Sequence, residues 1–254
     1  NALTAYLMIC DFSGIYQIEA PTIIRITKSK KSSQLSIPPR VTQNPNSLFL
    51  GRLNFSYKMS NLNYEFPLTN GGPVTGFNDP TISNFKGKPY YYLAREPIQN
   101  IIDNKLPNDE PAVVEYQLLK MRASELPNSE DLKNIFQKCK EFNAGQTDCV
   151  YFFEKAIRKI EKNAVIPILK ISDYNTTGLF GLDEDKNGSY FKFARSIGYS
   201  TSEGSRGGSW GLGKGSYYAA SKFRTIFFSS IWGDNQHVFQ GKLILASYED
   251  KGGI

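Results

Sequence analysis

The chain of 254 residues carries 30 Lys and Arg side chains against 24 Asp and Glu, which gives a net charge of +6 at neutral pH. Hydrophobic residues make up 40% of the chain, enough for a packed core, and this excludes wholesale disorder. No run approaches the roughly 20 apolar residues that a membrane span needs. The three cysteines lack metal-ligand spacing and indicate a reducing compartment such as the cytoplasm. The single histidine, His237, excludes multi-histidine metal sites.

The first part of the chain is rich in proline, serine and asparagine. Short β-like runs occur at 14–20, 22–27 and 47–57, and prolines separate them, so any sheet here is small or lies at an edge. Residues 3–10 are apolar but lack the basic flank and the cleavage site of a secretion signal. We therefore interpret residues 3–87 as a β-rich accessory segment.

From residue 88 the pattern changes to helices and strands in mixed order. Apolar spacing predicts helices at 91–106, 129–142, 147–162 and 213–222, with a helix-like stretch at 190–197. Apolar runs predict strands at 113–121, 165–171, 223–232 and 237–247. The last two strands are expected to form a hairpin that turns at 233–235. This order predicts an α+β fold in which helices cover one face of a mixed sheet.

A glycine-rich run at 207–215 is the densest chemical signal in the chain. Glycines at such spacing let backbone N–H groups turn toward an anion. The run does not match a Walker A loop, because Gly215 stands where a Ser or Thr is needed. It does not match a dinucleotide-binding fingerprint either, because Ser216 replaces the third glycine. The pattern Gly-x-x-Gly-x-Gly fits, and a flexible linker remains the alternative. The three glycines of that pattern are Gly208, Gly211 and Gly213.

Two further polar motifs precede the glycine run. Glu96, Asn100 and Asp103 lie four and three residues apart in a predicted helix, so they share one face. Asp173 follows the most apolar strand, and turn residues follow it as far as Gly178. A carboxylate at such a place can accept a hydrogen bond from an exocyclic amine, and small residues in the turn let a planar base approach the backbone.

The three motifs, in this order and with a long segment between the second and the third, resemble the GHKL ATPase superfamily of gyrase B, the heat-shock chaperones, the histidine kinases and MutL. The resemblance covers about residues 85–248 and is nearest to bacterial MORC/MutL-like ATP-binding proteins associated with restriction or anti-phage systems. It implies a Bergerat-type ATP-binding sandwich over residues 88–254, preceded by the accessory segment. It also implies ATP as ligand, Mg²⁺ as cofactor and a natural chain that continues past residue 254.

The resemblance also implies a role for each motif. Glu96 would orient or deprotonate the attacking water, Asn100 would hold Mg²⁺, and Asp103 would line the nucleotide pocket. Asp173 would accept a hydrogen bond from the adenine amine. The base would also be bordered by the turn residues Asn175, Thr177 and Gly178. The phosphates would be contacted by Gly208, Ser209, Gly211, Gly213 and Lys214.

Two features depart from the family pattern. Asn175 and Thr177 replace glycines of the family motif, although Asn tolerates positive φ better than most residues. Pro97 follows Glu96 directly, so the helix either begins at Glu96 or is kinked there.

The resemblance favours hydrolysis over protein phosphorylation, because Glu96 is present and His237 lies downstream of the nucleotide motifs. It implies slow, Mg²⁺-dependent ATP hydrolysis that drives lid closure or homodimerisation, in a bacterial DNA restriction or defence system. A protein or DNA partner would bind through residues 11–90 or a further C-terminal domain, and no membrane is expected to take part. The alternative is a non-hydrolysing nucleotide-binding or interaction module with a degenerate pocket, which the altered turn after Asp173 favours.

Overall fold

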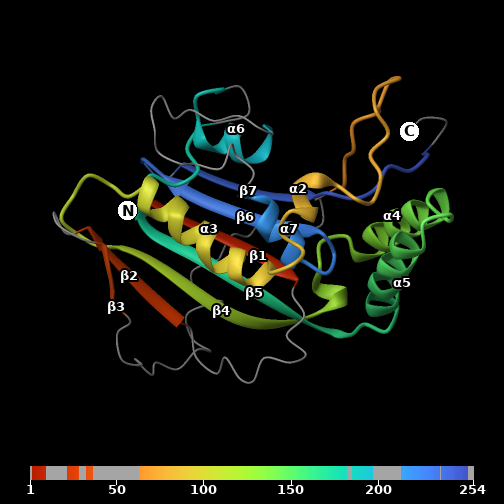
Figure 1. The fold of residues 1–254 in the computed structure, drawn as a ribbon, viewed down its shortest axis with the longest axis horizontal. Helices are drawn as coiled ribbons and strands as arrows, with labels where there is room; N and C mark the ends of the chain where they lie inside the picture. The colour runs from red at the N-terminus through yellow and green to blue at the C-terminus, as the bar shows by residue number, and fades with distance from the viewer. Residues whose placement is uncertain are drawn as a thin grey trace. The chain divides into compact units, whose positions relative to one another are not determined.

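A computed structural model gives the backbone of residues 2–9, 22–28 and 33–36 as strands and describes residues 63–181, 185–196, 213–234 and 236–250 in full. The chain is a mixed α+β protein (Figure 1). Within the described residues, no helix is long and apolar enough to cross a membrane.

Within the part of the chain that the structure describes, seven strands form one sheet in the order β3-β2-β4-β5-β1-β6-β7. They are β1 (Ala2–Ile9), β2 (Thr22–Lys28), β3 (Ser33–Ser36), β4 (Ala112–Arg122), β5 (Val165–Thr176), β6 (Thr225–Trp232) and β7 (Gln236–Leu243). The strands predicted at 22–27, 113–121 and 165–171 and the C-terminal hairpin are confirmed, with Trp232 paired to Gln236 beside the turn. The β-like runs predicted at 14–20 and 47–57 lie outside the described residues.

The N-terminal strand β1 lies in the middle of the sheet, where it pairs antiparallel with both β5 and β6. The chain divides into two compact units, of which the first comprises residues 1–38, 76–119 and 167–245. The remainder of the chain forms the second unit. Strands from the N-terminal segment hydrogen-bond to strands that follow residue 88. The division into domains at residue 88 stays a prediction.

The predicted helices are present, with ends displaced by a few residues. They are α3 (Pro89–Asp103), α4 (Ser129–Phe142), α5 (Thr147–Glu161), α6 (Ser189–Ala194) and α7 (Gly215–Ala220). A short helix, α2 (Pro80–Ser83), and a 3₁₀ turn at Ala123–Glu125 were not predicted. In α2 the Asp79 carboxylate accepts hydrogen bonds from the N–H and the hydroxyl of Thr81, at 2.7 and 2.6 Å, which caps the first turn.

Helix α3 begins before Glu96, the start that one of the two interpretations of Pro97 predicted. Pro89 occupies its first turn, where a missing N–H costs nothing, and Pro97 lies in its interior. The expectation that the helix begins at Glu96 was therefore wrong. Pro97 deprives the Leu93 carbonyl of its intrahelical donor. The neighbouring Ala94 carbonyl accepts a hydrogen bond from the Tyr116 hydroxyl on β4, at 3.2 Å.

The core of the first unit lies between the sheet and its helices. Buried side chains of α3, α6 and α7 form one cluster with those of β4, β5 and β6. In β5 the buried residues Leu169 and Ile171 alternate, so the same face of the strand also carries Asp173. Regular alternation therefore carries Asp173 to the helix-covered face of the sheet.

The second unit contains the antiparallel helices α4 and α5. Their facing apolar stripes bury Leu132, Phe136 and Phe153 completely, and Cys139 and Cys149 are equally buried. Burial raises the pKa of the Cys139 thiol to about 12, so this thiol stays protonated and unreactive at neutral pH.

Candidate functional site

Asn100 of the helix motif and Asp173 near the end of β5 meet at one small pocket of the first unit. Asn100 lines this pocket from α3, and Asp173 lines it from β5. The other lining residues are Pro97, Ile101, Asn104, Ile171, Thr176, Gly178, Leu179, Ser189 and Tyr217. The cavity volume is about 50 Å³, room for a few water molecules, whereas pockets for drug-sized molecules usually measure about 300 Å³ or more.

Asp173 is 8% exposed, and its carboxylate is hydrogen-bonded to the end of its own strand. The Thr176 hydroxyl donates to Asp173 Oδ1 at 2.5 Å, and both residues are buried. The strand carries Asp173 on its core face, directly after Ile171, the previous residue on that face. The sequence reasoning identified Asp173 but missed Thr176, because threonine at the end of a strand is common and has no motif of its own.

Asn175 adopts the left-handed conformation, with φ of 59°, as the sequence predicted that it could. Strand β1 pairs Leu3 with Tyr174 and Ala2 with Thr176, so Asn175 is an extra residue in β5, a β-bulge. The bulge breaks the alternation of side chains and brings Thr176 back to the side of Asp173. This geometry explains how two residues three positions apart can both line the pocket.

The Asn175 side chain holds a neighbouring loop and does not line the pocket. Its amide nitrogen donates to Asn108 Oδ1 at 2.9 Å and to the Glu110 carbonyl at 2.8 Å. The Asn108 amide donates in return to Asn175 Oδ1 at 2.9 Å. The two amides thus tie the end of β5 to the connection between α3 and β4.

Of the other predicted turn residues, Gly178 borders the pocket and Thr177 is not among its lining residues. Gly178 has a φ of 70° and lines the cavity, and its carbonyl accepts a hydrogen bond from Ser189 Oγ of α6 at 2.9 Å. Thr177 Oγ1 is buried and has no hydrogen-bond partner within the described part of the chain. An unsatisfied buried hydroxyl of this kind is a natural partner for a bound water or ligand.

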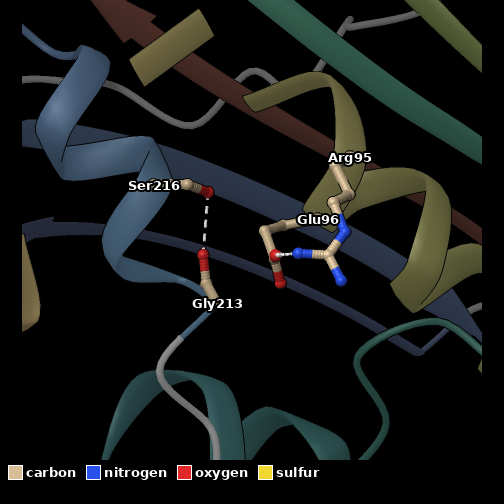
Figure 2. Close-up of polar contacts among 4 residues, drawn as sticks. All are labelled: Arg95, Glu96, Gly213 and Ser216. Carbon is tan, nitrogen blue, oxygen red and sulfur yellow. Dashed lines mark hydrogen bonds and ion pairs between the residues drawn. The ribbon is translucent and has the colours of Figure 1, made fainter. Parts of the chain in front are cut away.

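The three residues of the helix motif differ in their surroundings. Glu96 is 7% exposed and lies 3.6 Å from Arg95 Nη1, and its side chain extends from α3 into the space beside Gly213 (Figure 2). Asn100 is exposed and lines the pocket. Asp103 is exposed, accepts hydrogen bonds from Gln99 on the same helix at 3.1 and 3.2 Å, and is not among the lining residues of the pocket. Its part in a nucleotide site stays a prediction.

Of the glycine motif, only its end falls within the described residues: Gly208, Ser209 and Gly211 lie outside them. The Gly213 carbonyl accepts a hydrogen bond from the Ser216 hydroxyl at 2.7 Å, at the start of α7 (Figure 2). Helix α7 packs against α3, so the end of the motif lies next to the helix that carries Glu96.

Lys214 makes contacts that its sequence did not suggest. Its ammonium group donates to the carbonyls of Phe193 and Lys192, at 3.1 and 3.2 Å, and also to the Ser196 carbonyl. Burial and the neighbouring Lys242 lower the pKa of Lys214 to about 8, so the side chain still carries its charge at neutral pH. In this arrangement Lys214 caps the C-terminal end of α6. A phosphate contact would require Lys214 to leave these carbonyls.

The described residues contain no cluster of three or more His, Cys, Asp or Glu that could hold a metal ion by itself. Mg²⁺ bound with a nucleotide needs only one or two protein oxygen ligands, because phosphates and water complete its shell. The amide oxygen of Asn100, exposed at the pocket, fits that limited requirement.

No family model matches the chain, and comparisons with curated proteins and with solved structures likewise gave no match. The function is therefore inferred from the residues of the pocket and their geometry.

Proposed function

We propose that the chain binds Mg²⁺-ATP at the pocket between α3 and the end of β5 and hydrolyses it slowly, as an ATPase of the GHKL type with a Bergerat-type sandwich. One observation carries this proposal: Asn100 and Asp173, from two motifs far apart in the sequence, line the same pocket. In the proposal, binding closes a lid and pairs two chains, and the client is a protein or DNA of a restriction or defence system.

The residues divide the chemistry between them. Asp173 accepts a hydrogen bond from the base amine, which secures the nucleotide at the buried end of the site. Bound Mg²⁺ would neutralise the phosphate charge, with Asn100 supplying one oxygen ligand. Glu96, buried on the same helix and extending toward Gly213, orients the attacking water or accepts its proton (Figure 2).

The cavity must widen before a nucleobase can enter, because its volume of about 50 Å³ is well below that of an ordinary ligand pocket. The observation that favours the alternative function is this small volume, together with the Asn175 amide already bonded to the loop. A chain of this alternative kind would bind nucleotide weakly or not at all and would act through a protein or nucleic-acid surface.

Nucleotide binding separates these two functions. We expect wild type to bind Mg²⁺-ATP in calorimetric titration, and Asp173→Asn to lose about 2 kcal/mol of binding free energy, about 30-fold in affinity, because the hydrogen bond to a charged acceptor becomes a neutral one. Asp109→Ala, at an exposed carboxylate in the connection between α3 and β4, serves as the control and should bind as wild type does. Absence of ATP binding by the folded wild type would contradict the proposal.

Hydrolysis tests Glu96 separately from binding. We expect Glu96→Gln to lower the rate of phosphate release at saturating ATP by about 100-fold or more, with ATP affinity changed less than about threefold, because the loss affects proton transfer and water positioning. Glu154→Gln, at an exposed glutamate of α5, is the matched control. Equal rates in Glu96→Gln and wild type would exclude Glu96 as the general base and favour the non-hydrolysing alternative.

A further inference from the structure

Two oxygen-bearing side chains of β5, Asp173 and Thr176, line the pocket and are joined to each other. The Thr176 hydroxyl donates to Asp173 Oδ1 at 2.5 Å, and the two residues are 2% and 8% exposed. A hydroxyl group has one proton, and here that proton is directed at the carboxylate. An ionised carboxylate carries no proton to donate. The pair therefore offers hydrogen-bond acceptors to a ligand in the pocket and no donor.

The backbone holds this pair in place on both sides of the strand. Thr176 pairs with Ala2 of β1 on one side and forms an isolated bridge with Lys105 on the other. The next residue, Thr177, donates its N–H to the Asn104 carbonyl at 2.9 Å. The left-handed bulge at Asn175 aims the Thr176 side chain toward Asp173. The backbone hydrogen bonds at the end of β5 therefore fix the place of Thr176, and with it the position of its hydroxyl group.

We propose that Thr176 is a positioning residue that fixes the Asp173 carboxylate and makes the pocket selective for a purine with an amino group, and against one with a carbonyl group, at position 6. The proposal rests on the proposed function, because it concerns the base of the same nucleotide. A 6-amino group brings a proton to the acceptor pair. A 6-carbonyl oxygen placed against this pair would face oxygens with no proton between them, and such a contact is costly when buried.

Inosine triphosphate tests this directly, because its base carries a 6-carbonyl group and a protonated N1 where ATP has the 6-amino group and an unprotonated N1. Calorimetric titration of the folded wild type with Mg²⁺-ATP and Mg²⁺-ITP should show a preference for ATP of about 100-fold or more. Thr176→Ser keeps the hydroxyl and should keep this ratio within about threefold. Thr176→Val removes the hydroxyl, so the carboxylate can rotate out of the position in which it accepts from the 6-amino group. The ATP-to-ITP ratio should then fall by about 10-fold or more.

The ratio distinguishes positioning from a structural role. A general loss of packing in Thr176→Val would weaken the binding of both nucleotides equally. An unchanged ratio of ATP to ITP affinity in this variant would therefore overturn the proposal. Circular dichroism verifies that each variant is folded, and Thr176→Ala removes the same hydroxyl if the valine variant does not fold. Equal binding of ATP and ITP by wild type would also overturn the proposal, with ATP binding itself intact. Binding of neither nucleotide by wild type would instead refute the proposed function and this inference together.

Discussion

Replacing Gly215 with alanine is expected to destabilise the first unit by about 3 kcal/mol, at the upper end of the effects of overpacking. A Cβ at this position would lie 2.0 Å from the Thr81 carbonyl oxygen and 2.9 Å from the Phe85 ring. Helices α7 and α2 meet here with their backbones in close approach. The Thr81 backbone is in turn held by the Asp79 cap, so relief requires α2 or α7 to move as a whole.

Gly87→Ala is the matched control, since a Cβ there would meet no atom within 4 Å. Urea unfolding followed by circular dichroism should show a clear decrease in stability for Gly215→Ala and a change within about 0.5 kcal/mol for the control. Equal free energies of unfolding for the two variants would contradict the prediction, because α2 and α7 would then move apart without loss of stability. ATP binding should weaken together with stability in Gly215→Ala, because α7 also carries Tyr217 of the pocket.

Gly215 also gives a physical reason why the glycine run cannot be a Walker A loop. A Walker A loop needs a Ser or Thr at this position to reach Mg²⁺. The close approach of α2 leaves no room even for a methyl group at residue 215. The sequence excluded this reading by residue type, and the structure adds the steric reason.

Most helices and strands of the described residues could be predicted, because the spacing of apolar residues within each one is typical of its type of secondary structure. Helices α4 and α5 bury the side chains that their 3.6-residue spacing assigned to one stripe, and β5 is an apolar run as expected of an interior strand. Strand β1 was missed, although residues 3–10 are apolar. A short run at a chain end gives no indication of which strands it will join, since that depends on pairing with residues far along the sequence.

The site could be predicted where a motif fixes both residue type and spacing. Asn100, Asp173 and Gly178 line the pocket, and all three come from motifs. Ser189 and Leu179 line it as well, but nothing in their sequence context marks them. The partners of Lys214 were not foreseen either, because the carbonyls at the end of α6 are backbone groups that any sequence would offer.

Asn175→Ala is expected to destabilise the chain by about 3 kcal/mol, from two separate causes. The residue has a φ of 59°, a conformation that costs an alanine about 1 kcal/mol or more. The amide also makes hydrogen bonds to Asn108 and to the Glu110 carbonyl, and each buried or partly buried bond contributes about 1 kcal/mol net.

Asn175→Gly separates the two causes. Glycine adopts positive φ without strain but lacks the amide, so its loss of stability should be smaller than that of alanine by about 1 kcal/mol. Asn108→Ala removes the same amide pair and leaves the bulge unchanged, so the double variant with Asn175→Gly should lose less than the sum of the single losses. If alanine and glycine were equally destabilising, the left-handed conformation would contribute nothing to the cost of replacing Asn175.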